Sequence, residues 1–230
     1  MVSSETWALI PVKRFSHAKT RLSAVLETTE RAALAKAMLR DVLQNLRATP
    51  AIDGIAVISA DPEAFALAKA FDAAIIFDPD ESGVNAAVQA GLAAFLPHNR
   101  RVVVVPADIP FARPKDFEKV VELLDLTPVV LVPALYDGGT NALAMSSPDL
   151  IQPQFGPESF LAHRQVCRDR HLACSVLMSD GIGKDIDCQL DFGPCLVSSE
   201  NLGLTGVFLD QLNIAARFSI DDAPASLRLF

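Results

Sequence analysis

The chain has 230 residues, 50% of them hydrophobic, with 20 Lys and Arg against 28 Asp and Glu and a formal net charge of −8. This length and apolar content exclude a disordered chain and allow one large domain with a substantial core. The acidic balance argues against a nucleic-acid partner, and the lack of an apolar run of about 18 residues argues against a membrane span. The N-terminus lacks the basic segment of a signal peptide, so we expect a cytoplasmic protein.

Strand-like and helix-like segments alternate along the first part of the chain. The predicted strands are residues 6–12, 54–59, 73–77, 102–106 and 129–135, and the predicted helices are residues 29–47, 63–71, 85–96 and 116–126. The first helix is predicted from apolar residues at steps of four, namely Leu34, Met38, Val42 and Leu46. The continuous valine run at 102–105 is typical of a central strand that is buried on both faces.

The short connections between these segments favour parallel strands, right-handed crossovers and a layered α/β sandwich. After residue 135 the pattern changes. A tight turn at Gly138 and Gly139 leads into another strand, and a helix from residue 158 and a strand at 173–178 follow. We therefore expect one domain over residues 1–195 with a mostly parallel central sheet. Residues 196–230 form a C-terminal tail of undetermined role, which we expect to pack on the same domain.

The stretch IPVKRFSHAKTRLS, residues 10–23, gathers Lys13, Arg14, Lys19 and Arg21 directly after the first strand. A solvated loop is the ordinary explanation of such a cluster. In open α/β sheets, however, ligands bind outside the carboxyl ends of strands. Polar segments 78–85 and 106–110 also follow predicted strands. This common position favours a ligand site that includes Lys13, Lys19 and Arg21.

Three aspartates are candidates for a metal site. Asp108 stands between two prolines after the valine run, and its oxygens suit Mg²⁺, although it could instead cap the following helix. Asp185 and Asp187 flank one isoleucine, so on an extended segment their side chains point the same way and could join Asp108. A solvated pair is the alternative. Basic residues opposite a metal carboxylate suit a polyphosphate.

Two further segments, DGGTNAL (137–143) and FGPESF (155–160), combine glycines with the hydroxyls of Thr140 and Ser159. Each has an ordinary explanation, a hairpin turn for the first and a helix start for the second. Together they predict a second anion site made of main-chain amides and hydroxyls. The four cysteines, Cys167, Cys174, Cys188 and Cys195, lack metal-binding spacing, and we expect reduced, partly buried thiols.

The segments IPVKRFSHAKTRLS, ESGVNAAVQAG, VVPADIP, DGGTNAL and FGPESF, in this order, resemble the CofC-type guanylyltransferases of deazaflavin coenzyme F-420 biosynthesis. The resemblance implies a nucleotidyltransferase with the glycosyltransferase-A-like, three-layer α/β/α fold. It also implies transfer of GMP from GTP to the phosphate of 2-phospholactate, phosphoenolpyruvate or 3-phosphoglycerate, with release of diphosphate. Mg²⁺ is the implied cofactor, and no covalent intermediate with the protein is needed.

Site residues follow from the resemblance position by position. The residues implied to bind the phosphates are Lys13, Lys19 and Arg21, and the implied metal ligands are Asp108 and Asp187. The nucleotide contacts are Pro11, Ser82, Gly83, Asn85 and Pro106, and the acid contacts are Thr140, Asn141, Gly156, Glu158 and Ser159. Lys19, a long cation on a polar loop, is expected to contribute to kinetics and little to stability, whereas Arg14 is expected to be exposed.

Two departures from the family pattern stand out. The segment DIDCQLDF lacks the Thr-Pro that follows the second aspartate in the family, and Glu158 replaces a glycine. Among the three acids, 3-phosphoglycerate alone carries a free hydroxyl, so a hydrogen bond to Glu158 favours this substrate. The residues leave two alternatives open: transfer to another acceptor, such as a sugar phosphate or a cofactor alcohol, and a non-catalytic GTP-binding domain. They also leave open whether the protein is a monomer or a homodimer.

Overall fold

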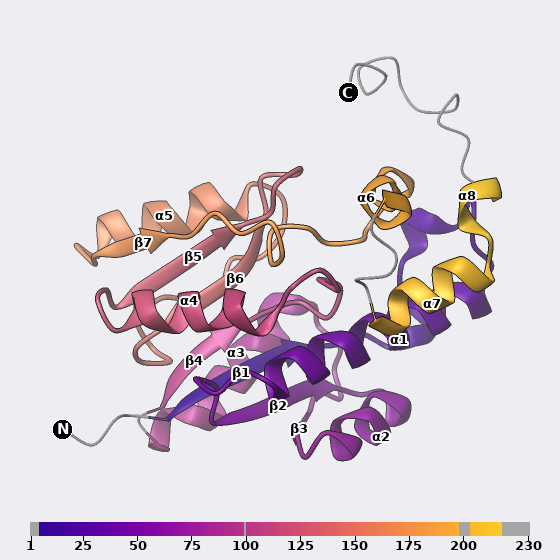
Figure 1. Cartoon of the computed structure of the whole chain (residues 1–230). Helices are drawn as coiled ribbons and strands as arrows, with labels where there is room; N and C mark the ends of the chain where they lie inside the picture. Colours follow the sequence, from indigo (N-terminus) through magenta and orange to yellow (C-terminus); the bar gives the residue numbers. More distant parts are fainter. Residues whose placement is uncertain (1–4, 99, 198–202, 218–230) are drawn as a thin grey trace.

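The computed structural model describes residues 5–98, 100–197 and 203–217 (Figure 1). Seven strands of this part of the chain form one sheet in the order β3-β2-β1-β4-β6-β5-β7. The four strands β3, β2, β1 and β4 are parallel to their neighbours, and so are β5 and β7. Strand β6 is antiparallel to both β4 and β5. The strands are β1 (Thr6–Pro11), β2 (Gly54–Ser59), β3 (Ala74–Phe77), β4 (Arg101–Val104), β5 (Val129–Pro133), β6 (Thr140–Met145) and β7 (Cys174–Val176).

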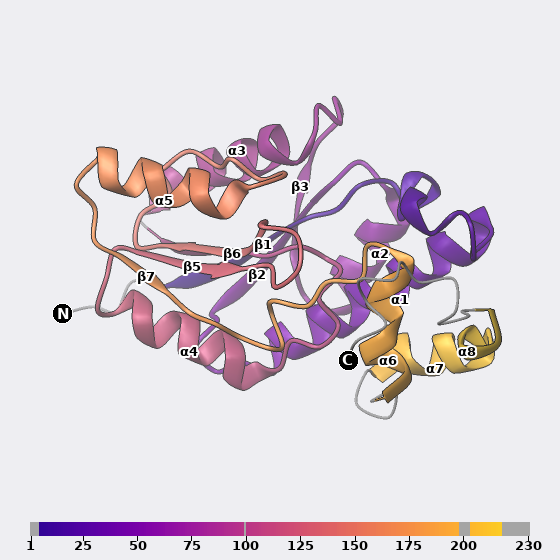
Figure 2. The ribbon, with the colours of Figure 1, turned by 90° about the horizontal axis from the view of Figure 1, so that it is seen from above.

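Helices cover both faces of the sheet, which confirms the predicted three-layer α/β fold. Seen from above, α3 and α5 lie over one face and α1, α2 and α4 lie over the other (Figure 2). The helices are α1 (Thr28–Arg47), α2 (Pro62–Ala70), α3 (Val84–Phe95), α4 (Pro114–Leu124), α5 (Ser159–Asp169), α6 (Phe192–Val197), α7 (Gly203–Gln211) and α8 (Ile214–Arg217). Short 3-10 turns lie at η1 (Phe15–His17), η2 (Thr20–Leu22), η3 (Leu96–His98) and η4 (Gln189–Asp191). None of the helices in the described segments is long and apolar enough to cross a bilayer.

The sheet separates two hydrophobic cores because successive side chains of a strand point to opposite faces. In β1, Ala8 and Ile10 belong to the core under α1, α2 and α4, whereas Leu9 belongs to the core under α3 and α5. The central strand β4 is buried on both faces, as the valine run predicted. The apolar stripe of α1 is also buried along its whole length, because it packs onto the sheet.

Part of the C-terminal tail packs against α1. The carboxylate of Asp41 accepts the main-chain N–H of Leu204 at 2.9 Å and that of Thr205 at 2.8 Å. A negative charge at a helix N-terminus is favourable, so Asp41 caps α7 and holds it on α1 (Figure 1). The remainder of the predicted tail, residues 198–202 and 218–230, lies outside the described residues.

The direction of β6 brings distant segments to one edge of the sheet. Because β6 is antiparallel to its neighbours, its first residues, Thr140 and Asn141, lie beside the carboxyl ends of β4 and β5. The carboxyl end of β1, which leads into the basic stretch, meets the same edge. Ligands of open α/β sheets bind at this edge, so it is the place to look for a functional site.

Candidate functional site

One ammonium and two carboxylates meet at the carboxyl edge of the sheet. Nζ of Lys19 lies 2.5 Å from Oδ2 of Asp108 and 2.7 Å from Oδ1 of Asp187. Lys19 comes from the loop after β1, Asp108 from the segment after β4, and Asp187 from the loop that precedes η4. The lysine side chain is only 7% exposed, so it is buried within this cluster. Arg21 lies at its exposed rim, 3.8 Å from Asp187.

The charges in this cluster shift one another's pKa values. Burial acts to lower the pKa of Lys19, but Asp108 and Asp187 outweigh it and hold this pKa above its ordinary value. Burial raises the pKa of Asp108, and the neighbouring Asp187 adds to this effect while Lys19 opposes it. For Asp187 the effect of burial is overcome by Lys19 and Arg21, so its pKa is lowered. The lysine thus stabilises two carboxylates that would otherwise repel each other.

Asp185, the other aspartate of the DID pattern, lies near enough to this cluster for the charges of Asp108 and Asp187 to affect its pKa. Burial and the nearby Asp108 raise the pKa of Asp185 to about 6. Nδ2 of Asn141 donates to Oδ1 of Asp185 at 3.1 Å and to the carbonyl of Ile182 at 3.0 Å. Asn141, predicted from the resemblance to contact an acid substrate, therefore binds the loop that holds the aspartates.

These residues fit a hard divalent cation such as Mg²⁺. Two carboxylates already converge on one positive charge, and Oδ1 of Asp108 is buried without a hydrogen-bond partner. Such an oxygen is available as a ligand, and Mg²⁺ prefers oxygen ligands. Within the described ranges, no group of three His, Cys, Asp or Glu side chains forms a complete metal site. Mg²⁺ usually keeps several waters and binds through one or two carboxylates together with substrate phosphates.

A second cluster consists of three buried side chains around the start of α5. Thr140 Oγ1 lies 3.0 Å from Nδ1 of His163 and accepts from Oγ of Ser159 at 3.2 Å. The main-chain N–H of Gln154 donates to Nε2 of His163 at 2.9 Å. Thr140 and Ser159 were predicted to form an anion site, whereas His163 was not. The available signal was its position four residues after Ser159, which places both on one face of α5.

The segments predicted to hold the nucleoside and the acid are joined directly. Asn85 at the start of α3 donates to the carbonyl of Phe155 at 2.9 Å and accepts from the N–H of Phe155 at 2.7 Å. Ser82 and Gly83 precede it on an exposed loop, where φ of +103° at Gly83 favours glycine. The side chain of Arg14 is 41% exposed, as expected, and pairs with Glu81 of this loop at 2.7 Å.

The other predicted site residues lie along the same edge. Lys13 and Gly156 are exposed, and Pro11 and Pro106 are partly buried near the ends of β1 and β4. Glu158 precedes α5 with φ of +55°, and its carboxylate faces Gly138, where an added Cβ would lie 2.9 Å from Oε1. Glu158 therefore points across the glycine turn that leads to Thr140.

All four cysteines are free thiols, as expected. Cys167 and Cys195 are buried, whereas Cys174 and Cys188 are partly buried. Burial raises the pKa of each thiol, to about 12 for Cys174 and Cys195, so these residues are poor nucleophiles.

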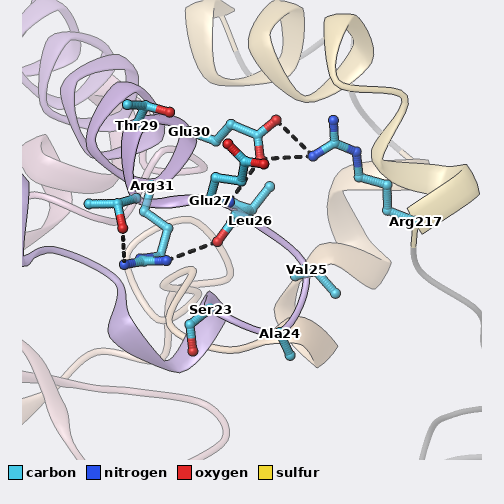
Figure 3. Close-up of a pocket in the computed structure, with 10 residues that line it drawn as sticks. Ser23, Ala24, Val25, Leu26, Glu27, Thr29, Glu30, Arg31 and Arg217 are labelled. Carbon is cyan, nitrogen blue, oxygen red and sulfur yellow. Dashed lines mark hydrogen bonds and ion pairs between the residues drawn. The ribbon is translucent and has the colours of Figure 1, made fainter.

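A separate hollow of about 660 Å³ lies between the start of α1 and α8 (Figure 3). Arg217, Glu30 and Arg31, which line it, already make contacts within the protein. Arg217 donates to both oxygens of Glu30 at 2.8 Å, and Arg31 donates to the carbonyl of Leu26 and the hydroxyl of Thr28. None of the residues of the two clusters lines it, so we assign the functional site to the sheet edge.

Comparison with known proteins gives one family. The family described as "Guanylyl transferase CofC like" matches residues 6–226, which includes much of the tail. A phosphoenolpyruvate guanylyltransferase of Conexibacter woesei is 36% identical over 81% of this chain and 85% of its own. A 2-phospho-L-lactate guanylyltransferase of Methanothermobacter thermautotrophicus is 35% identical over 85% and 86% of the two chains. A 3-phospho-D-glycerate guanylyltransferase of Phenylobacterium zucineum is 35% identical over 82% of this chain and 90% of the relative.

A solved structure supports the fold. The crystal structure of a candidate nucleotide-diphospho-sugar transferase from Desulfovibrio desulfuricans superimposes with a TM-score of 0.75 and 21% identity. The match covers 95% of this chain and 100% of the other. The arrangement of the sheet and its helices is therefore shared with this solved structure.

Proposed function

The chain belongs to the family of CofC-like guanylyl transferases, and we propose that it transfers GMP from GTP to the phosphate of a phosphorylated three-carbon acid. The observation that carries this proposal is the cluster in which Lys19 bridges Asp108 and Asp187 at the carboxyl edge of the sheet. Mixed charges of this kind suit a metal-bound triphosphate. The product, a guanosine diphosphate adduct of the acid, would serve coenzyme F-420 biosynthesis in the cytoplasm.

The reaction needs no nucleophile from the protein. An oxygen of the acid's phosphate attacks the α-phosphorus of GTP in line, the bond from this phosphorus to the β-phosphate oxygen breaks, and diphosphate leaves. The attacking phosphate is already an anion, so no general base is required. The task of the protein is to hold two mutually repelling anions in line and to stabilise the charge of the transition state.

Positive charge at the phosphates comes from the basic stretch. Lys19 is already fixed in the cluster, and the exposed side chains of Lys13 and Arg21 can move to meet phosphate oxygens. Asp108 and Asp187 would hold Mg²⁺, which supplies further positive charge to these oxygens when it is bound. The nucleoside is assigned to the loop of Ser82, Gly83 and Asn85, together with Pro11 and Pro106.

The acid is assigned to the second cluster. Thr140, Ser159 and the main chain at Gly156 offer donors to its anionic groups, and Asn141 links this cluster to Asp185. Among the acids we favour 3-phosphoglycerate, because the carboxylate of Glu158 lies across the turn at Gly138 and can accept from its free hydroxyl. Phosphoenolpyruvate and 2-phospholactate offer no such donor.

Diphosphate release tests the proposal. The purified chain is incubated with Mg²⁺ and GTP, ATP, CTP or UTP, together with each of the three acids, and diphosphate is measured over time. We expect release that requires GTP and an acid and that stops with a chelator. Release with a sugar phosphate alone would support the rival acceptor, whereas GTP binding without release under any condition would support a non-catalytic domain.

A further inference from the structure

We propose that His163 is a positioning residue for the acid substrate, because it makes the hydroxyl pair of Thr140 and Ser159 a hydrogen-bond donor toward the site. This inference rests on the proposed function, in which the two hydroxyls meet an anionic group of the acid. His163 lies on α5 and is fully buried, so it acts through these neighbours and has no contact with solvent.

The main chain determines which nitrogen of His163 carries the hydrogen. The N–H of Gln154 points at Nε2 from 2.9 Å, and a main-chain N–H can only donate. Nε2 must therefore be the accepting nitrogen, and the hydrogen of the neutral ring is on Nδ1. Burial lowers the pKa of His163 to about 4, although a hydrogen bond with the backbone of Ser159 acts in the opposite direction. The ring is thus neutral near pH 7, as this tautomer requires.

The hydrogens of the cluster can then be counted. Nδ1–H of His163 donates to Oγ1 of Thr140 at 3.0 Å. The hydroxyls of Thr140 and Ser159 share one hydrogen bond at 3.2 Å, which uses one of their two hydrogens. The other hydrogen has no acceptor within hydrogen-bond reach among the described residues, so it is available to a ligand.

The opposite tautomer would remove this donor. With Nδ1 as an acceptor, Thr140 would donate to His163 and Ser159 would donate to Thr140, and no hydroxyl hydrogen would remain. A carboxylate or a phosphate dianion accepts hydrogen bonds and does not donate them. The contact between Gln154 and His163 therefore sets the cluster to receive an anion.

His163 also steadies the segment that carries the predicted acid contacts. Its ring packs edge-on against Phe155, with ring centroids 5.3 Å apart and an interplanar angle of 71°. Two hydrogen bonds with Asn85 hold the main chain of Phe155 as well. Loss of the imidazole could thus act by disturbing the loop, and the test must separate this effect from loss of the donor.

Two amide variants make this separation. The amide of Asn lies close to the position of Nδ1, so His163→Asn keeps a donor toward Thr140 and loses the acceptor for Gln154. The amide of Gln reaches the position of Nε2, so His163→Gln keeps that acceptor and loses the donor. We expect His163→Gln to raise KM for the acid at least about 10-fold with KM for GTP within about 2-fold, and His163→Asn to raise KM for the acid less. In a Thr140→Val background the effect of His163→Gln on this KM should disappear, because the two residues act as one unit.

Several outcomes would overturn the inference. Equal effects of both variants on the KM values of both substrates, or additive effects in the double variant, would show a merely structural role. Nitrogen NMR of the wild type gives a readout that is independent of activity, and a hydrogen on Nε2 of His163 would refute the argument. Absence of diphosphate release by the wild type with all three acids would refute the proposed function instead. In that case the NMR result would still show whether the hydrogen of His163 is on Nδ1, as the inference requires.

Discussion

Replacing Lys19 with methionine removes one ammonium from between two carboxylates and keeps a side chain of similar length. The lysine is 7% exposed and Asp108 is 23% exposed, so water replaces the lost charge poorly at Asp108. The burial and the two contacts of Lys19 argue against the expectation that it contributes little to stability. That expectation assumed a solvated loop, whereas the loop after β1 turns this side chain inward.

The magnitude follows from the two contacts. At an effective dielectric constant of about 20, unit charges at the 2.5 and 2.7 Å separations attract by roughly 6 kcal/mol each. The cost of removing the ions from water, several kcal/mol each, offsets much of this. The contact with Asp187 is also weakened by solvent, because that side chain is 40% exposed. We expect Lys19→Met to lower the free energy of unfolding by about 2–4 kcal/mol, or Tm by roughly 5–12 °C.

The assay is thermal unfolding without added metal, and Lys13→Met is the matched control. Lys13 is an exposed lysine of the same stretch, so its removal should change the free energy of unfolding by less than about 0.5 kcal/mol. Adding Asp108→Asn to Lys19→Met should recover part of the loss, because the unpaired charge is then gone. Equal Tm values for the two lysine variants would refute this reasoning.

Three further changes test other parts of the site. Asp108→Asn should reduce diphosphate release at least about 100-fold while the protein stays folded, and near-normal activity would remove Asp108 from the metal site. Glu158→Gly should relax the preference among the acids, and glycine also accepts φ of +55° without strain; an unchanged ranking of the acids, or a wild-type preference for phosphoenolpyruvate, would contradict this role. The His163 contribution to the free energy of unfolding should fall by up to about 3 kcal/mol as pH drops from about 6.5 to about 4, because this side chain, with its pKa lowered to about 4, takes up a proton in the unfolded chain first. Asp185, with its pKa raised to about 6, acts in the opposite direction in this window, so the contribution is measured as the difference between the wild type and His163→Asn. His163→Asn should remove this part of the pH dependence, and equal slopes for the two proteins in this window would count against it.

The order of elements along the chain could be predicted, but their order in the sheet could not. Periodicity identified the strands and the stripe of α1, since each depends on neighbours in sequence. The turn at Gly138 and Gly139 also indicated the antiparallel pair of β5 and β6. Insertion of β6 between β4 and β5 depends on contacts between distant segments, which local patterns do not contain.

The candidate site was predictable where residues follow strands and unpredictable where side chains meet. The rule on carboxyl ends of strands placed Lys19 and Asp108 at one edge, but it did not indicate that they touch. His163 escaped notice because a single histidine on an amphipathic helix is usually an ordinary core residue. Its role depends on contacts with two residues outside α5. Gln154 lies on the loop before α5, and Thr140 is the first residue of β6.

The loop at DIDCQLDF is held by several hydrogen bonds although it lacks the Thr-Pro pair. Oδ2 of Asp191 accepts the main-chain N–H of Asp187 at 2.8 Å and that of Cys188 at 2.7 Å. The side chain of Cys188 in turn accepts from the main chain of Asp191, the last residue of η4, and Cys188 stands where the family pattern has threonine. A thiol accepts more weakly than a hydroxyl, and Gln189 lacks the fixed φ of proline, but neither change removes the carboxylate that holds the loop. Because Ile186 also donates to the carbonyl of Asp108 at 3.0 Å, the main chain on both sides of Asp187 is held, and its carboxylate stays at Lys19 without the Thr-Pro pair.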